Sequence, residues 1–530
     1  MARWATSPMD RRQILLFSPT LDAVISEDHP VRLFDEILSA QDWHAWEAHY
    51  VQGAGQPPIH PRIVAGAILY GLSQGVRSSR QLERACTVSL DFLWLVEGRR
   101  IDHSTFCKFR TQFGRELRGL FCQIGRVAMA MGLIRLNQVA LDGTKVQANS
   151  SRHATASASS LEARLAALDE QVDRLLAEAQ EADRQDSTLW GESGTPNRLP
   201  RALADLRRRQ ERLRQALATA REKQARAKRA TSKKSAETAK PAKAAKVPVA
   251  DPDSTVQPNK EGGYAPNYVP MATVDGEKGM IVDPDVLRHT EEGTVTVATV
   301  DRIESELGAK PRQLLADTAH AAGKNLAGLA ERDVEAFIPL NQRENPDNPA
   351  RREDPAQPVA QEDWPNLPRN GRTRKLDRAA FVFDRAADCY YCPMGQKLTF
   401  IGIQDKQRDT GGGVYRKYRC GACASCPLAT ECVASKTASR TVYREEYEDL
   451  REAMDGRLRS EEGRKVYSRR KWIAETPFAV LKRVMGLRQF LLRGHEKVKT
   501  EWLWACTAFN LRKMVSEVAR SRARLGVLCA

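Results

Sequence analysis

The chain has 530 residues, and its 83 Lys and Arg against 67 Asp and Glu give a net charge of +16. At about 150 residues per domain, this length predicts about three or four folding units. The longest apolar stretch, 63–72, spans ten positions, whereas a membrane-spanning helix needs about 18 residues. We therefore expect no membrane span, and the polar first residues predict no secretory signal. The positive charge favours a polyanionic partner, nucleic acid ahead of a membrane surface, although a basic surface that only aids solubility also fits.

Residues 1–135 are predicted to form an N-terminal domain that is mostly helical from residue 10 onward. The run 59–74 predicts an apolar helix, Ser78–Cys86 begins a second helix, and Ser104 is placed to cap a third. Short helices with basic residues near their starts suit a helix-turn-helix-like DNA-binding domain, and a plain helical bundle fits the same periodicity. These basic residues are Arg77, Arg80, Arg84, Lys108 and Arg110.

Residues 136–150 break with this helical pattern. Leu136–Val146 carries β-branched residues and ends in turn-forming residues, which predicts a strand. Asp142 interrupts the apolar face of that strand, so we treat its carboxylate as a candidate site group.

Residues 151–250 are predicted to form an inserted module. Leucines recur at alternating spacings of three and four residues within 159–228, which is a heptad pattern on two segments. The sequence 191–197 interrupts this pattern, so we expect an antiparallel hairpin of two coiled-coil-like helices. The tract 221–246 holds ten Lys and Arg against two Glu, half of the net charge, and is expected to be a flexible linker. The hairpin either mediates dimerisation or packs only on itself.

Residues 251–375 are expected to continue the α/β core that the first strand begins. Strands are predicted between 264 and 340, including the β-branched run 294–300 and a run that ends at Asp317. A helical segment and another strand follow, which implies a βαβ unit with Asp317 at the carboxyl end of its strand. Residues 341–375, rich in Pro, Asn, Arg and Asp, are expected to form a linker or mobile loop.

Residues 376–445 are predicted to be a zinc-ribbon-like insertion. Six of the eleven cysteines fall within 44 residues here: Cys389, Cys392, Cys420, Cys423, Cys426 and Cys432. Pairs spaced as C-x2-C and separated by a hairpin's length suit a tetrahedral Zn²⁺. Six thiols are more than one zinc ion needs and too few for two four-thiolate sites. A closed thiolate site would have a structural or DNA-contacting role rather than a catalytic one.

The remaining residues, 446–530, are predicted to be helical and carry Glu475. Asp142, Asp317 and Glu475 each lie on or beside a predicted strand or helix. Carboxylates hold the two divalent cations of phosphodiester chemistry, about 3.5–4 Å apart, and Mg²⁺ suits such a site because it prefers oxygen ligands. Each acid is only one of 67 in the chain, so the flanking sequences must carry the argument.

Five blocks follow one another along the chain: 9–38, 59–110, VALDGTKVQANSS (139–151), LLADTAHAAGKN (314–325) and YSRRKWIAETPFAVLK (467–482). Together they resemble the bacterial insertion-sequence transposases of the DDE class. The resemblance is closest to the branch sometimes called the eleven-eighty-two insertion-sequence family. It covers nearly the whole chain outside 151–250.

The resemblance implies an RNase H-like α/β core in which Asp142, Asp317 and Glu475 are the catalytic acids and hold Mg²⁺ or Mn²⁺. It implies a transposase that cleaves the ends of its element and joins the 3′-hydroxyl ends to target DNA. The implied partners are double-stranded DNA, with the terminal repeats and the target site, and a second copy of the chain in a paired-end complex. The implied location is the bacterial cytoplasm, in association with the nucleoid.

The last block departs slightly from the family pattern Tyr-x2-Arg-x3-Glu-x6-Lys. Glu475 follows Arg470 after four residues rather than three, so either Arg470 or Lys471 fills the arginine position. The resemblance implies DNA-phosphate contacts from Tyr467, Arg470, Lys471 and Lys482. A spacing of seven residues places Glu475 and Lys482 on one helix face.

Two further residues of this block carry structural expectations. Pro477 disfavours a helix interior, so we expect the helix to start or kink there, with Glu475 in its first turn. Trp472 is expected to pack in the core, and stacking on an extruded base is the alternative.

The family pattern also implies a zinc ligand set of Cys392, Cys423, Cys426 and Cys432. Cys389 and Cys420 are then surplus or an alternative pair of ligands. Two other functions also fit parts of the sequence. A non-catalytic nucleic-acid-binding regulator would explain the charge, heptads and cysteines, and a Mg²⁺ nuclease would hydrolyse DNA without joining it.

Overall fold

The computed structural model describes residues 20–50, 57–190, 201–231, 246–258, 262–340, 347–371, 373–405, 414–434 and 437–529. The first 19 residues, the predicted break at 191–197, residues 232–245 of the basic linker and 341–346 of the predicted loop lie outside this description. Among the described residues, no helix combines the length and apolar character that a membrane span requires.

Within the described residues, seven helices precede the first strand: α1 (Pro30–Ser39), α2 (His44–Glu47), α3 (Pro61–Ser73), α4 (Ser79–Val88), α5 (Leu90–Leu95), α6 (His103–Gln112) and α7 (Gly114–Ala130). The apolar α3 is buried along nearly its whole length, as predicted. The cap of α6 was wrongly predicted. Asp102 rather than Ser104 caps this helix, and its carboxylate accepts a hydrogen bond from the Ser104 backbone N–H at 2.7 Å.

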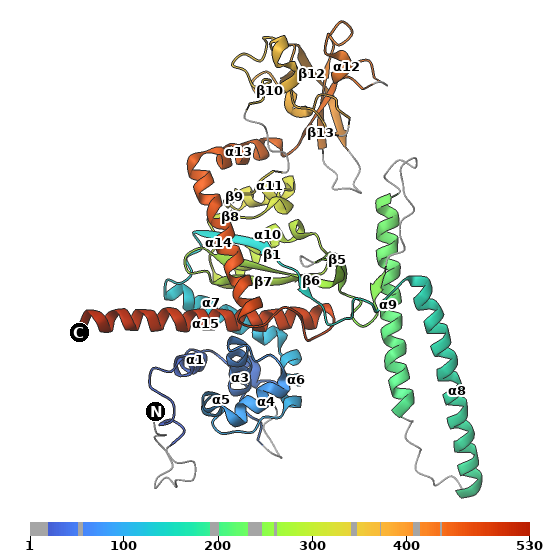
Figure 1. The fold of residues 1–530 in the computed structure, drawn as a ribbon, viewed down its shortest axis with the longest axis vertical. Helices are drawn as coiled ribbons and strands as arrows, with labels where there is room; N and C mark the ends of the chain where they lie inside the picture. The colour runs from blue at the N-terminus through green and yellow to red at the C-terminus, as the bar shows by residue number, and fades with distance from the viewer. Residues whose placement is uncertain are drawn as a thin grey trace, which may run out of the picture.

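A seven-stranded mixed sheet forms the centre of the molecule (Figure 1). Its strands are β1 (Gln138–Gly143), β2 (Val146–Gln147), β5 (Thr255–Pro258), β6 (Tyr264–Asp275), β7 (Ile281–Leu287), β8 (Gln313–Leu315) and β9 (Glu335–Phe337). β6 pairs with β7 and β1 in antiparallel fashion, whereas β8 and β9 continue the sheet parallel to β1. The helix α11 (Gly323–Glu331) connects β8 to β9, which confirms the predicted βαβ unit.

The prediction of a strand over 294–300 was wrong. These residues enter a 3-10 helix, η2 (Glu292–Val295), and the helix α10 (Thr296–Leu307). The buried residues of α10 recur at helical spacing: Thr296, Thr299, Val300, Ile303 and Leu307. This buried face continues to Leu307, beyond the β-branched run. Packing of the whole helical face therefore overrides the local strand propensity of residues 294–300.

Two long helices project from the side of the sheet (Figure 1). The helices α8 (Ala158–Trp190) and α9 (Arg201–Thr231) pack antiparallel. Two ion pairs show this direction: Glu162 pairs with Arg221, and Asp169 pairs with Arg214. Their contact is a separate small core that includes Leu161, Leu168, Leu213 and Leu217. At its base, β3 (Thr155–Ala156) pairs with β4 (Val247–Pro248).

The cysteine-bearing segment folds as a five-stranded antiparallel sheet with its own core (Figure 1). Its strands follow chain order: β10 (Val382–Asp384), β11 (Cys389–Tyr391), β12 (Lys397–Asp405), β13 (Val414–Cys420) and β14 (Thr441–Glu445). A short helix, α12 (Ala429–Cys432), lies between the last two strands, and α13 (Glu448–Arg459) leads back to the central sheet.

The chain ends in two long helices, α14 (Glu461–Arg483) and α15 (His495–Cys529). α15 lies between the central sheet and the N-terminal helices (Figure 1) and packs on both. Apolar residues on all of its faces are buried, among them Trp502, Trp504, Phe509 and Met514. One continuous core therefore joins the N-terminal helices, the sheet and α15.

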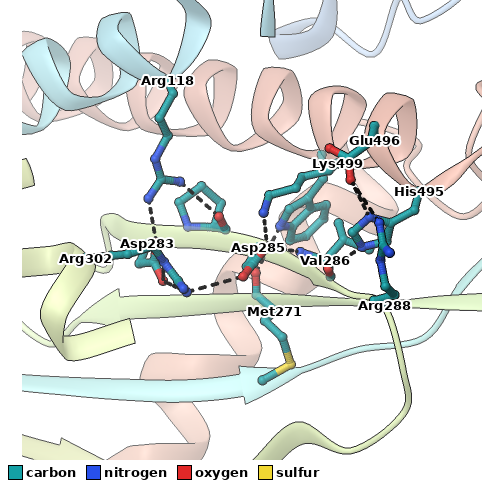
Figure 2. Close-up of polar contacts among 12 residues, drawn as sticks. Arg118, Met271, Asp283, Asp285, Val286, Arg288, Arg302, His495, Glu496 and Lys499 are labelled. Atoms are coloured by element: carbon teal, nitrogen blue, oxygen red, sulfur yellow. Dashed lines mark hydrogen bonds and ion pairs between the residues drawn. The ribbon is translucent and has the colours of Figure 1, made fainter. Parts of the chain in front are cut away.

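A network of ion pairs reinforces this junction (Figure 2). Asp283 on β7 is 2% exposed, and it pairs with Arg118 of α7 at 2.6 Å and with Arg302 of α10 at 2.7 Å. Its neighbour Asp285 pairs with Lys499 of α15 at 2.9 Å. The network therefore connects three helices from distant parts of the chain to one strand.

Candidate active site

The sheet register places Asp142 and Asp317 next to each other. β1 and β8 are parallel neighbours in which Ala140 pairs with Leu315, and each acid lies two residues beyond its paired residue. Asp317 caps a 3-10 helix, η3 (Thr318–His320), and its carboxylate accepts from the Ala319 N–H at 2.9 Å. Both carboxylates therefore stand at the carboxyl edge of the parallel strands, where sequence analysis expected Asp317.

The helix α14 supplies the third acid. Ser460 is the N-cap of this helix, and its hydroxyl accepts a hydrogen bond from the Gly463 N–H. The helix then continues through Pro477 to Arg483. The expectation that the helix starts or kinks at Pro477, with Glu475 in its first turn, was therefore wrong as to the start. α14 packs against β1 and β6, which brings the exposed Glu475 to the same edge of the sheet.

Charge interactions link Asp142 to the other two acids. Asp142 is only 19% exposed, and burial raises the pKa of its carboxyl. The negative charges of Asp317 and Glu475 raise this pKa further, whereas Arg470 and the Gly143 N–H lower it. Negative charges that converge on one carboxyl group make an electrostatic environment that attracts a cation.

Arg470 faces this group, whereas Lys471 is exposed. The Arg470 guanidinium lies 3.1 Å from Asp142 Oδ1 and is 18% exposed. Tyr467 lies one helical turn earlier, and burial raises the pKa of its hydroxyl while the Arg470 charge opposes the rise. Of the two cations that the sequence left open, Arg470 is the one that contacts a site acid.

Lys482 lies farther along α14, beside the turn that follows β1. Its ammonium donates to Thr144 Oγ1 at 2.5 Å and to the Lys145 carbonyl at 2.9 Å. Lys482 therefore fixes the turn after Asp142 to α14.

Two further residues, Glu292 and His320, lie beside Asp317 and were not predicted from the sequence. One ligand atom from each of Glu292, Asp317 and His320 lies within 4.8 Å of the other two. Burial, followed by the charges of Asp317 and Asp142, raises the pKa of Glu292 to about 7. The block LLADTAHAAGKN displayed His320 three residues after Asp317, but Glu292 lay in a stretch without a recognisable signal.

The donor set suits a divalent cation. The site offers carboxylate oxygens from four acids together with the buried His320 imidazole. The carboxylates suit Mg²⁺ and Mn²⁺ alike, the imidazole suits a transition metal such as Mn²⁺, and negative charge is in excess before any cation binds.

The predicted basic residues of the N-terminal helices divide into two groups. Arg80, Arg84 and Lys108 are exposed. Arg77 instead donates to the backbone carbonyls of Gly486 and Gln489, each at 2.6 Å. The Arg77 guanidinium is therefore engaged inside the protein, and its predicted DNA contact stays a prediction.

Arg110 is also an internal residue. Its guanidinium donates to the Arg77 carbonyl, and burial lowers its pKa. Its charge is directed into the junction with the C-terminal segment, and its predicted DNA contact likewise stays a prediction. The cause is tertiary packing of α6 against α15, which the local sequence does not reveal.

Trp472 is 60% exposed, so the expectation that it packs in the core was wrong. It lies beside the buried Ile473 on α14, and together with Phe509 of α15 they line a shallow pocket. The helix directs Ile473 and Ala474 toward the sheet, which leaves Trp472 on the outer side.

Five cysteines line one cavity of about 240 Å³: Cys392, Cys420, Cys423, Cys426 and Cys432. A hydrogen bond with Cys420 lowers the pKa of the Cys392 thiol, although burial acts in the opposite direction. Cys389 lies on β11, where burial raises the pKa of its thiol and the nearby charges are those of Asp384 and Lys397. The geometry thus groups Cys420 with the four expected ligands and separates Cys389 from them.

Two family comparisons match the chain. Residues 391–515 match the family described as a transposase DDE domain, and residues 19–112 match the family described as transposase domain (DUF772). Glu475 lies inside the first matched range, whereas Asp142 and Asp317 lie between the two ranges. No curated protein matches the chain. The presence of both transposase domains in one chain supports an insertion-sequence transposase of the DDE class.

Proposed function

We propose that this transposase cleaves the ends of its insertion sequence and joins the resulting 3′-hydroxyl ends to target DNA, with Asp142, Asp317 and Glu475 as catalytic acids. The observation that carries the proposal is the meeting of these acids at one sheet edge, where Asp317 and Glu475 both raise the pKa of Asp142. Three antiparallel strands continued by two parallel ones support an RNase H-like core. The five sequence blocks support membership of the eleven-eighty-two branch.

A bound Mg²⁺ or Mn²⁺ supplies positive charge that stabilises the phosphodiester transition state. The chain's own residues orient the reaction. Arg470 holds the Asp142 carboxylate through its 3.1 Å ion pair, and Lys482 anchors the turn after β1 to α14. Tyr467, Lys471 and the outer face of α14 extend the site toward a DNA phosphate. Arg80, Arg84 and Lys108 offer exposed charge for a second DNA contact.

A joining assay tests this function. DNA that carries the sequences flanking the gene is incubated with the protein and a target duplex, with Mg²⁺ or Mn²⁺. The proposal predicts cleaved ends whose 3′-hydroxyls are covalently joined to the target. Cleavage without joining would identify a nuclease, and metal-independent binding without cleavage would identify a regulator. Sizing of the protein–DNA complex tests the proposed homodimer.

The cysteine cavity supports a structural Zn²⁺ held by four of its five thiols. The proposed set is Cys392, Cys423, Cys426 and Cys432, with Cys420 as the alternative ligand. We predict one zinc ion per chain by elemental analysis, and loss of that zinc in Cys423→Ser. Cys389→Ser is the matched control and keeps its zinc, because Cys389 lies beside Asp384 rather than among the thiols of the cavity. Zinc loss in the control and not in Cys423→Ser would contradict this ligand set.

A further inference from the structure

Glu292 comes together with Asp317 and His320 from a separate segment of the chain. Glu292 begins η2, Asp317 follows β8, and His320 ends η3. Two glycines permit this approach. A Cβ on Gly293 would lie 2.3 Å from the Ala319 carbonyl oxygen, and one on Gly143 would lie 3.0 Å from the Glu292 carboxyl group. A side chain at position 293 would collide with the Ala319 backbone, and a side chain at position 143 would crowd the Glu292 carboxylate.

The His320 imidazole is held by a hydrogen-bond network on its Nδ1 side. The ring is fully buried, and its Nδ1 lies 2.9 Å from Thr296 Oγ1. The Thr296 hydroxyl donates its single proton to the Gly293 carbonyl at 3.1 Å. Thr296 therefore accepts from His320 Nδ1–H, and this assignment leaves a lone pair on Nε2.

The Nε2 atom has no hydrogen-bond partner among the residues that the structure describes. It is directed at the acidic group, 3.8 Å from Asp317 Oδ1. Buried polar atoms are nearly always satisfied, and a lone pair facing a carboxylate is not satisfied by that carboxylate. An imidazole whose Nδ1–H is anchored by a polar oxygen is the arrangement in which histidine binds metal through Nε2.

We propose that Glu292, Asp317 and His320 bind a divalent cation, each through one ligand atom, and that this site favours Mn²⁺ over Mg²⁺. The preference follows from the imidazole, because nitrogen ligands suit transition metals whereas Mg²⁺ takes oxygen ligands. The inference rests on the proposed function in that Asp317 belongs to both the catalytic acids and this site. It adds two ligands that the sequence did not indicate.

The test uses Mn²⁺ as the probe and the full-length chain without DNA. Titration followed by electron paramagnetic resonance gives the affinity, and pulsed measurements on the bound ion detect coupling to the ¹⁴N nucleus of a coordinated imidazole. We expect this coupling in the wild type and its loss in His320→Asn. Glu292→Gln is expected to weaken Mn²⁺ binding at least about tenfold.

Two matched controls separate this site from incidental binding. Glu291→Gln changes the exposed neighbour of Glu292, and His44→Ala removes an exposed imidazole of the N-terminal helices. Both are expected to keep the wild-type affinity and coupling. Circular dichroism checks the fold of each variant, and the conservative Glu292→Gln keeps the test valid if His320→Asn misfolds.

Absence of ¹⁴N coupling in the wild type, its persistence in folded His320→Asn, or unchanged affinity in Glu292→Gln would each overturn the proposal. The readout does not depend on DNA cleavage. A chain that shows the imidazole coupling but never cleaves its DNA contradicts the proposed function alone. A chain that cleaves and joins DNA without the coupling contradicts this inference alone.

Discussion

At the scale of single residues, the site centres on Asp142, where burial and the charges of Asp317 and Glu475 raise the carboxyl pKa and Arg470 lowers it. Asp142, Asp317 and Glu475 were predictable because recognisable sequence blocks surround each of them. Glu292 and His320 were not, because Glu292 reaches Asp317 only through the close contact of η2 with η3. The roles of Arg470 and Lys471 also needed the structure, since helix rotation decides which cation faces Asp142.

Arg470→Ala is predicted to reduce the rate of DNA cleavage on the order of 100-fold, as for loss of one preorganised electrostatic contact. The reason is the loss of the cation that orients the Asp142 carboxylate and partly neutralises its negative charge. Lys471→Ala is the matched control, because Lys471 is exposed on the same helix. Single-turnover cleavage at saturating protein measures both rates. Equal losses in the two variants would contradict the distinction drawn here.

At the scale of elements, helices and strands with clear periodicity were predictable, and α3 and the βαβ unit are examples. The run 294–300 was not, because its β-branched residues favour a strand while the buried face of α10 follows a helical period. The junction of α7, α10 and α15 on β7 was also beyond sequence analysis, since its ion pairs join distant residues (Figure 2).

Asp285 gives this junction a pH dependence. Burial acts to raise the pKa of its carboxyl, but Lys499 and Arg302 outweigh burial, and the net pKa lies below the ordinary value. Because the folded-state pKa is the lower one, the ionised carboxylate stabilises the fold above about pH 4, and this contribution is lost as the pH falls further.

We therefore predict that Asp285→Asn lowers the free energy of unfolding by about 2 kcal/mol at pH 7. The difference from wild type should shrink as the pH falls below about 4. Asp301→Asn is the control, because Asp301 forms a half-exposed pair with Arg332 and is expected to cost less than about 1 kcal/mol. Urea unfolding at several pH values measures these differences. A constant difference at every pH would be inconsistent with the role of Asp285.

At the scale of the whole molecule, the N-terminal helices and the central sheet share one core because α15 is buried between them. Sequence analysis predicted the order of the segments but treated the N-terminal helices as a separate domain. The burial of α15 on both sides is a long-range property, and so is the use of Arg77 at the junction with Gly486. The hairpin of α8 and α9, in contrast, has its own small core.

The hairpin is therefore predicted to be dispensable for folding. β3 and β4 pair through Ala156 and Val247, so residues 157–246 can be replaced by a two-residue Asn-Gly turn. We expect the shortened chain to keep its cooperative unfolding and its oligomeric state, because the hairpin packs on itself. Calorimetry and light scattering measure both properties. A change from dimer to monomer would instead assign the hairpin to assembly.

The central claim is that Asp142, Asp317 and Glu475 act together in one catalytic site. The most direct measurement is DNA cleavage by purified Asp142→Asn, Asp317→Asn and Glu475→Gln, beside Glu462→Gln, an exposed acid in the first turn of α14. We predict that each of the three variants binds the DNA ends but does not cleave them, whereas Glu462→Gln cleaves like the wild type. Metal-dependent cleavage retained in any of the three variants would contradict the claim.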